Sequence, residues 1–294
     1  MNDLILKFKF WVKASRGYSL PMSLLSFLVV FSWCVKEGGK ISYGLVALLG
    51  IAFAHLGTNL FDDFIDFKNN VPKQEAKRTY FQNSNITLKT IFFATFICFF
   101  ISFVIGIFFI YKVRIEVLYI SLFTGLLCAL YPKLNHISLG EVALILTFGP
   151  NLFYGVSLVM GVGFSLELFI ISLLVGILTL ILLLTHAFMD FDTDKEVNKK
   201  TLLVRLGTKE RALNFLFLLL AICYVTLFYL IFTKVISPFG VISIFTLHLV
   251  VRLYKYLKDY IVTPDSKLFL RNFIIARNIV SLLDIIISIA ILVR

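Results

Sequence analysis

Residues 166–207 read LELFIISLLVGILTLILLLTHAFM followed by DFDTDKEVNKKTLLVRLG, an apolar stretch that passes abruptly into a charged one. The apolar part, 166–189, is long enough for one helical crossing of a bilayer, which takes about 20 residues. It is far longer than a barrel strand and shows no alternation of apolar and polar residues. These residues therefore predict a transmembrane helix that ends in a loop rich in Asp and Lys.

The rest of the chain repeats this pattern of long apolar blocks. Of its 294 residues, 60% are hydrophobic and only 15% are charged, whereas a soluble domain carries roughly 25% charged residues. A water-soluble monomer could not cover so much apolar side chain, so a soluble globular protein is excluded. We predict an all-α polytopic membrane protein with nine transmembrane helices. The expected spans are 19–35, 41–61, 88–111, 115–131, 139–162, 166–189, 212–233, 235–254 and 272–293.

The net charge of +11 is best explained by membrane topology. Most Lys and Arg residues lie at the ends of apolar blocks, and no basic patch lies on a soluble domain, so nucleic acid is not an expected partner. With a cytoplasmic N-terminus, 21 of the 28 Lys and Arg residues fall on the cytoplasmic side, six fall outside and Arg277 lies within the last span. We therefore expect a multi-pass protein of the cell membrane, in contact with the lipid bilayer. Its N-terminus and both long polar loops should be cytoplasmic.

The first long loop follows a cluster of acids at the end of the second span. Asn59, Asp62, Asp63 and Asp66 are three or four residues apart or adjacent, so a continuing helix would place them in one polar stripe. Carboxylates on one face repel each other unless a cation lies among them. Hard oxygen ligands of this kind suit Mg²⁺, which commonly bridges to substrate phosphates.

A second acidic cluster ends the sixth span. Asp190 and Asp194 are four residues apart and His186 lies one turn earlier, whereas Asp192 would point about 160–200° away on a helix. The cations that follow directly are Lys199, Lys200 and Arg205. Carboxylates beside cations make a site for a metal-bound polyanion, because the metal holds phosphate oxygens and the cations neutralise the rest.

One acidic helix end beside Lys is most often a solvated surface. Here two such clusters lie on the same side of the membrane, both after even-numbered spans. Acids at membrane depth are costly and usually functional. We therefore predict that the two clusters together clamp a diphosphate. The even-numbered placement also suggests one domain, 1–294, made of two related halves, roughly 1–135 and 136–294.

These residues resemble the two Asp-rich motifs of the UbiA superfamily of intramembrane prenyltransferases. Residues 62–70 (DDFIDFKNN) match the first motif, NDxxDxxxD, with Asp62 in place of Asn and Asn70 at its last acidic position. Residues 190–207 match the second motif, DxxxD followed by GKxTLxVxLG, with Asn198 in place of Gly. The resemblance spans nearly the whole chain. It implies nine helices around a central cavity that binds Mg²⁺ and a prenyl diphosphate.

Weaker features resemble one subfamily, the 1,4-dihydroxy-2-naphthoate polyprenyltransferases of menaquinone biosynthesis. Residues 16–21 (RGYSLP) are similar to its ARPKTLP motif, and Tyr131-Pro132, residues 139–141 (LGE) and residues 148–150 (FGP) match its YP…LGE…FGP pattern. The Asn and Arg usual before the second motif are replaced by His186, Ala187 and Met189. The Lys-Gly-x-Asp that follows the first motif in that subfamily is absent.

The resemblance implies transfer of a polyprenyl group from its diphosphate to an aromatic acceptor, with Mg²⁺ as cofactor. The implied catalytic residues are Asp63, Asp66, Asp190, Asp194 and Lys199. The implied metal ligands are Asp62, Asp63, Asp66, Asp190 and Asp194. The implied substrate-binding residues are Arg16, Asn59, Asp62, Tyr131, His186, Lys200 and Arg205. Besides 1,4-dihydroxy-2-naphthoate, the superfamily's acceptors include 4-hydroxybenzoate, chlorophyllide, haem and glycerophosphate lipids.

A cation-coupled secondary transporter is the alternative from another class. Its carboxylates would lie at mid-membrane beside helices broken by Gly or Pro, whereas here the clustered acids lie at span ends and no such pair of broken helices is evident. Three further polar residues are expected within or near spans. Arg277 and Asp284 are seven residues apart and are expected to pair. Glu141 either orients the acceptor or a motif side chain, or hydrogen-bonds a neighbouring helix.

Overall fold

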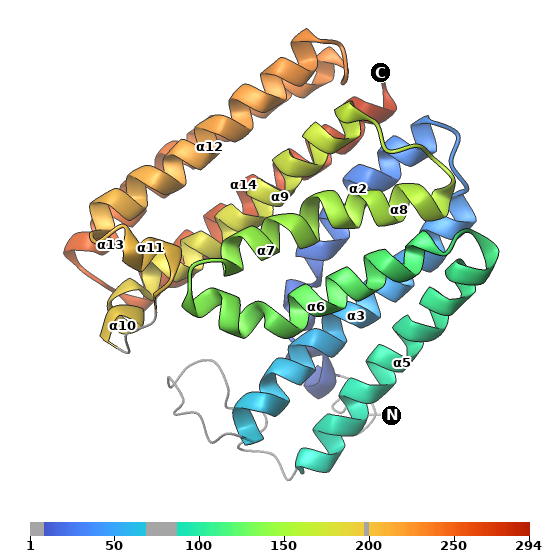
Figure 1. The fold of residues 1–294 in the computed structure, drawn as a ribbon. Helices are drawn as coiled ribbons and strands as arrows, with labels where there is room; N and C mark the ends of the chain where they lie inside the picture. Colours follow the sequence, from blue (N-terminus) through green and yellow to red (C-terminus); the bar gives the residue numbers. More distant parts are fainter. Residues whose placement is uncertain (1–8, 69–86, 197–199) are drawn as a thin grey trace. The chain divides into compact units, whose positions relative to one another are not determined.

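The predicted spans all coincide with helical segments. The computed structural model describes residues 9–68, 87–196 and 200–294, and this part of the chain contains no strand. Seven of its helical segments are long and apolar enough to cross a membrane, and two shorter apolar helices, Leu20–Lys36 and Glu116–Tyr131, cover the remaining predicted spans. The all-α membrane fold is therefore confirmed, while the count of nine crossings stays a prediction. Figure 1 labels most of these helices along the chain.

The described chain forms two compact units. One comprises the described residues within 1–24 and 42–118, and the other those within 25–41 and 119–294. The first unit contains the short η1 (Gly17–Ser19), most of α3 (Ile41–Lys68) and α5 (Leu88–Lys112), while α2 (Leu20–Lys36) contributes residues to both. The sequence predicts that two halves of the chain, 1–135 and 136–294, are related to each other. The division into compact units does not test this, so it stays a prediction.

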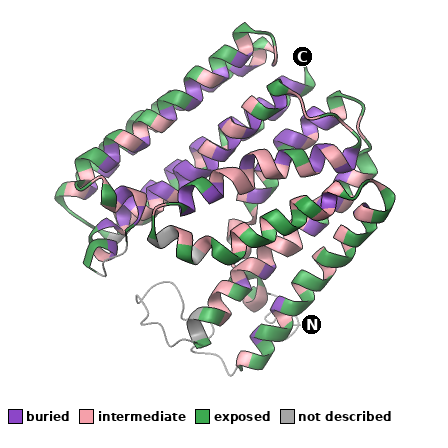
Figure 2. Ribbon diagram, viewed as in Figure 1, coloured by how far each residue is buried: buried purple, intermediate pink, exposed green. Residues whose placement is uncertain are grey.

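The second unit holds the remaining helices. They are α6 (Glu116–His136, mostly in this unit), α7 (Gly140–Leu146), η2 (Thr147–Asn151), α8 (Leu152–Met160), α9 (Leu166–Met189), α10 (Phe191–Glu196), α11 (Leu202–Arg205), α12 (Lys209–Phe232), η3 (Pro238–Thr246), α13 (Leu247–Val262) and α14 (Ser266–Leu292). Helix α9 packs against η2, α12 and α14. Within its most apolar window 72% of the residues are buried, against 11% for α5. Figure 2 shows α9 mostly in the colour of buried residues and α5 mostly in that of exposed ones. Helix α9 is therefore the core of its unit.

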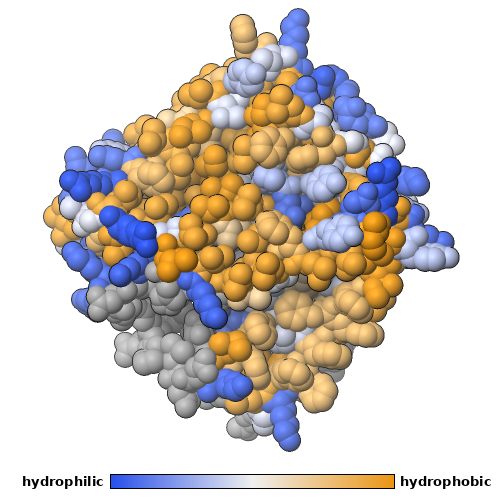
Figure 3. Space-filling view, viewed as in Figure 1, coloured by the Kyte–Doolittle hydropathy of each residue, from blue (hydrophilic) through white to orange (hydrophobic). Residues whose placement is uncertain are grey.

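The exposed surface is strongly apolar. Large side chains such as Phe93, Phe103 and Tyr119 are more than half exposed. Figure 3 shows hydrophobic side chains over much of the visible face, with hydrophilic ones gathered mainly toward its edges. A water-soluble protein rarely exposes contiguous apolar surface of this extent, whereas lipid covers it at no cost.

One transmembrane segment is interrupted in the middle, which the sequence analysis did not anticipate. Between α7 and α8 the chain forms the π-helical turn η2, where Gly149 has non-helical angles (φ −102°, ψ −109°) and Pro150 follows. A Cβ atom at Gly149 would lie 2.5 Å from the carbonyl oxygen of Ser172 in α9. Glycine is thus required at this position because the two backbones touch.

The expected Arg277–Asp284 pair is wrong. Arg277 is exposed and donates to Asn278 Oδ1 at 3.4 Å, whereas Asp284 is 1% exposed and its Oδ1 has no hydrogen-bond partner in the part of the chain that the structure describes. Seven residues do return to the same helix face. However, α14 packs against η3, α13 and α9, so the face that is exposed at Arg277 is covered at Asp284.

Candidate active site

The first Asp-rich motif lies on an unbroken helix and is held by an arginine. Asp62 and Asp63 belong to the last turns of α3. The Nη2 atom of Arg16 donates to Asp62 Oδ2 at 3.2 Å and also to Asp63 Oδ1. The Asp63 side chain is 12% exposed and that of Asp62 is 43% exposed. A single guanidinium therefore offsets the repulsion between two adjacent carboxylates.

An unusual backbone conformation accompanies this contact. Arg16 adopts left-handed angles (φ 52°, ψ 39°) immediately before η1, a region that costs a non-glycine residue free energy. The Ser19 backbone N–H and hydroxyl both donate to the Arg16 carbonyl at 2.8 Å. The backbone turn at residues 16–19 thus includes Arg16, whose side chain contacts α3. The structure therefore brings together three predicted site residues. They are the substrate-binding residue Arg16 and the metal ligands Asp62 and Asp63.

The polar stripe of α3 continues one and two turns earlier. Asn59 donates through Nδ2 to the Ser15 carbonyl and the Ser19 hydroxyl, both at 3.1 Å. The two ring nitrogens of His55 hydrogen-bond Ser19 and Ser23, both at 2.7 Å. His55 thus makes the packed, hydrogen-bonded contacts of a structural residue. The backbone of Asp66 lies on α3, and its side chain is outside the part of the chain that the structure describes.

The second motif interrupts its helix. Helix α9 ends at Met189, Asp190 has φ −91° and ψ 5°, and α10 begins at Phe191. The Asp194 N–H donates to the Asp190 carbonyl at 2.8 Å, so the two residues remain one turn apart across the break. His186 Nδ1 lies 3.1 Å from Asp190 Oδ2. The predicted pair His186 and Asp190 is in contact.

The carboxylates of the second motif have different surroundings. Asp194 is 7% exposed, whereas the side chain of Asp192 is 63% exposed and pairs with Lys209. Asp192 therefore faces solvent, as its predicted helical phase requires. Asp194, in contrast, is shielded from the solvent that Asp192 faces.

Aromatic side chains surround the start of the second motif. The rings of Phe269 and Phe273, both on α14, pack edge-on against His186 with centroids 5.3 and 6.1 Å away. The Tyr260 hydroxyl of α13 donates to the Met189 carbonyl at 3.1 Å. These contacts hold the end of α9 against α13 and α14. Sequence reasoning missed these three residues, because nothing in their spacing links them to His186.

The cations that follow the second motif lie on or beside the short α11. Lys200 and Arg205 are exposed, and Thr201 caps α11 by accepting from the Val204 N–H at 3.4 Å. Predicted catalytic residue Lys199 lies outside the described residues. Tyr131 is half-buried on α6.

Comparison with known proteins decides the family. A model of the UbiA prenyltransferase family matches residues 23–274, which include both Asp-rich motifs. The chain belongs to the UbiA prenyltransferase family. No curated protein matches its sequence.

Solved structures share the UbiA fold along almost the whole chain. A UbiA homologue from Aeropyrum pernix K1 in its apo form is 13% identical, with 92% of this chain and 97% of that chain covered and a TM-score of 0.70. A digeranylgeranylglyceryl phosphate synthase is also 13% identical, with 98% and 99% covered and a TM-score of 0.68. A UbiA homologue from Archaeoglobus fulgidus bound to GPP and Mg²⁺ is 17% identical, with 97% and 100% covered and a TM-score of 0.63. At these identities the likeness establishes the fold alone.

The donor set of this UbiA family member suits a hard divalent cation. The motif side chains that the structure describes offer carboxylate oxygens, with no thiol beside them. Among the described residues, His, Cys, Asp and Glu form no group of three or more that could hold a metal ion. The motif carboxylates are instead distributed between the two units, with Asp62 and Asp63 in one and Asp190 and Asp194 in the other. By donor chemistry they fit Mg²⁺, and their metal-binding role stays a prediction.

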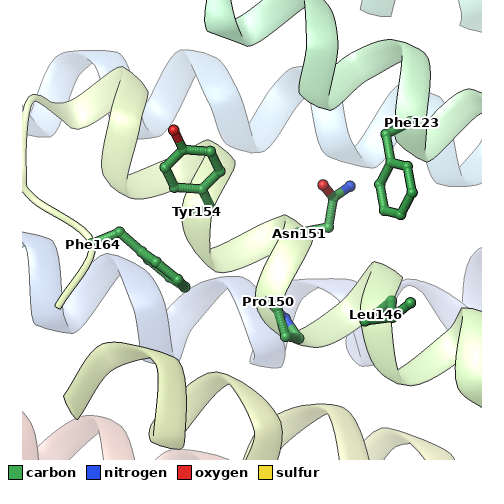
Figure 4. A pocket seen from close by; sticks show the side chains of 6 residues that line it. All are labelled: Phe123, Leu146, Pro150, Asn151, Tyr154 and Phe164. Atoms are coloured by element: carbon green, nitrogen blue, oxygen red, sulfur yellow. The ribbon is translucent and has the colours of Figure 1, made fainter. Parts of the chain in front are cut away.

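A pocket lies beside the interrupted helix. Its volume is about 270 Å³, and it is lined by Phe123, Leu146, Pro150, Asn151, Tyr154 and Phe164. Figure 4 shows the Asn151 amide between the ring of Phe123 and those of Tyr154 and Phe164. Asn151 donates to the Thr124 hydroxyl, which links η2 to α6. The lining includes no predicted site residue, and its signal in the sequence was the Phe-Gly-Pro run at 148–150.

Proposed function

We propose that this protein transfers a polyprenyl group from its diphosphate to an aromatic acceptor, 1,4-dihydroxy-2-naphthoate, and so forms a menaquinone precursor. The observation that carries the proposal is that acids and cations occur together at the ends of two spanning helices. Asp62 and Asp63 contact Arg16, and Asp190 and Asp194 precede a segment with exposed Lys200 and Arg205. Such pairs suit a metal-bound diphosphate.

Mg²⁺ is the proposed cofactor, held by Asp62, Asp63, Asp66, Asp190 and Asp194. When bound, it would neutralise charge on the diphosphate and so favour its departure. The solved homologues from Archaeoglobus fulgidus include complexes with GPP or DMAPP and Mg²⁺, which supports this assignment.

The chain's own residues have two tasks in this reaction. Arg16, Lys199, Lys200 and Arg205 would hold the diphosphate oxygens, where charge grows as the carbon–oxygen bond breaks. The allylic cation is then attacked by an electron-rich ring carbon, which afterwards loses its proton. His186, held edge-on by Phe269 and Phe273, would contact the acceptor beside that site.

A direct assay tests the reaction and its acceptor. Purified protein in lipid nanodiscs would receive labelled farnesyl or geranylgeranyl diphosphate with a panel of acceptors. The panel contains 1,4-dihydroxy-2-naphthoate, 4-hydroxybenzoate, chlorophyllide, haem and a glycerophosphate lipid. We expect a prenylated naphthoate product, and none from the Asp63→Ala/Asp190→Ala protein. Transfer to another acceptor alone would replace the proposed substrate, and no transfer to any of them would overturn the proposed function.

The same proposal requires both motifs at the cytoplasmic face, where a diphosphate made in the cytosol can reach them. Single cysteines at Lys77 or Lys199, in a cysteine-free background, should react with an impermeant thiol reagent only from the cytoplasmic side. A cysteine at Lys36 is the matched control and should react from outside. Labelling of either loop position in intact cells would contradict the orientation.

A further inference from the structure

The turn that joins α6 to α7 contacts the segment that carries the second motif's cations. Ser138 has left-handed backbone angles (φ 61°), which a non-glycine residue adopts only when its surroundings require it. Its hydroxyl donates to the Lys200 carbonyl at 2.5 Å, across 62 residues of sequence. This turn therefore holds the backbone of a residue predicted to bind the diphosphate.

Glu141, in the first turn of α7, makes a second contact to the same segment. Its Oε1 accepts a hydrogen bond from the Leu202 N–H at 3.1 Å, across 61 residues. Leu202 is the first residue of α11, and the N–H groups of a helix's first turn have no partner within the helix. Glu141 supplies that partner from another helix. The contacts of Ser138 and Glu141 thus flank Thr201, which is itself 3% exposed.

The Glu141 side chain is buried at a cost in free energy. The residue is 5% exposed, and its Oε2 is buried without a hydrogen-bond partner among the described residues. Burial of a carboxylate is unfavourable unless it is compensated. The described contact that offsets this cost is the hydrogen bond from the Leu202 N–H, so the burial of Glu141 is tied to the position of that backbone.

We propose that Glu141 and Ser138 are positioning residues for prenyl diphosphate binding. They clamp the backbone from Lys200 to Leu202 and thereby set where the cationic side chains of this segment meet the diphosphate. The proposal rests on the proposed function and adds two residues that act through Lys200 rather than on the substrate itself. Because the clamp is made of hydrogen bonds, its loss should weaken diphosphate binding and leave acceptor binding unchanged.

The test compares Glu141→Ala with Glu141→Gln in the full-length protein. Calorimetry with an unreactive farnesyl thiolodiphosphate measures binding, and steady-state kinetics measures KM for each substrate. Loss of a buried hydrogen bond to a charged group should raise the Kd of the analogue about 10-fold to 100-fold in Glu141→Ala. Glu141→Gln keeps an acceptor for the Leu202 N–H and should stay within about 5-fold of wild type. The KM for the acceptor should not change in either variant.

Amide hydrogen exchange provides a readout that does not depend on turnover. Exchange of the Leu202 amide should speed up in Glu141→Ala and stay near wild type in Glu141→Gln. Ser138→Ala should add less than its separate effect when combined with Glu141→Ala, because both side chains hold one segment. Glu167→Ala is the matched control, since Glu167 is an exposed glutamate in the first turn of α9, and it should change neither binding nor Leu202 exchange.

The outcomes separate the two proposals. Faster exchange in Glu141→Ala without weaker analogue binding would overturn the positioning role and leave the proposed function intact. Equal losses in Glu141→Gln and Glu141→Ala would overturn the hydrogen-bond clamp, since charge alone would then matter. Absence of analogue binding by the wild-type protein would overturn the proposed function and, with it, this extension.

Discussion

The two Asp-rich motifs carry similar residues on different backbones. The first lies on the unbroken helix α3, where Asp62 and Asp63 share one guanidinium, that of Arg16. In the second, the helix breaks at Asp190, and its acids have separate surroundings, with Asp190 beside His186 and Asp192 beside Lys209. A continuous helix keeps adjacent carboxylates close together, so they need a shared cation. Asp190 and Asp192 are two residues apart and point in different directions, so each takes its own partner.

The largest expected effect is that of metal removal, which tests whether the acidic motifs act through a divalent cation. Treatment with EDTA should abolish prenyl transfer, and Mg²⁺ or Mn²⁺ should restore it, because both motifs offer hard oxygen ligands. Product formation with labelled prenyl diphosphate measures the effect. Full turnover after exhaustive chelation would contradict the diphosphate clamp.

Removal of one carboxylate from either motif should have the next largest effect. Asp63→Ala and Asp190→Ala should each lower kcat/KM at least ~100-fold, as expected when an oriented metal ligand is lost. The same is expected of Asp66→Ala and Asp194→Ala. A large loss from Asp63→Ala alone, with Asp190→Ala near wild type, would show that only the unbroken motif holds the metal.

Replacing Arg16, whose guanidinium is shared by the first motif's carboxylates, should lower activity less than replacing a carboxylate. Arg16→Gln should raise KM for the prenyl diphosphate about 10-fold, because one charged hydrogen-bonding partner is lost. Arg16→Lys should recover part of this, since it retains the charge without the planar fork. Steady-state kinetics with varied diphosphate measures both variants. Equal values for the two variants would contradict a role for the guanidinium geometry.

The smallest effect is expected at Asp192. Its side chain is 63% exposed and pairs with Lys209, and such surface pairs contribute roughly 0–1 kcal/mol to stability. Asp192→Ala should therefore leave kcat/KM within about 3-fold of wild type and barely change thermal stability. An effect as large as that of Asp190→Ala would show that Asp192 leaves the surface when substrates bind.

Much of the architecture could be predicted because hydropathy is a property of short segments. In lipid, every apolar block must satisfy its backbone hydrogen bonds internally, so each becomes a helix. The segment 139–162 was predicted only as a span, because its interruption at Gly149 depends on the Ser172 carbonyl of another helix. The Arg277–Asp284 pairing failed for the same reason, since periodicity says which residues share a face and not what covers that face.

The candidate site, too, has features that the sequence determines and features that only the packing of helices determines. The sequence by itself determined that this is an all-α membrane protein, and it located two acidic motifs with their cations, because acids in apolar surroundings are rare and conspicuous. Only the tertiary structure decided which partner each group takes. Arg16 meets Asp62 across 46 residues and Glu141 meets Leu202 across 61. Such contacts depend on how helices pack, and no local pattern of residues encodes them.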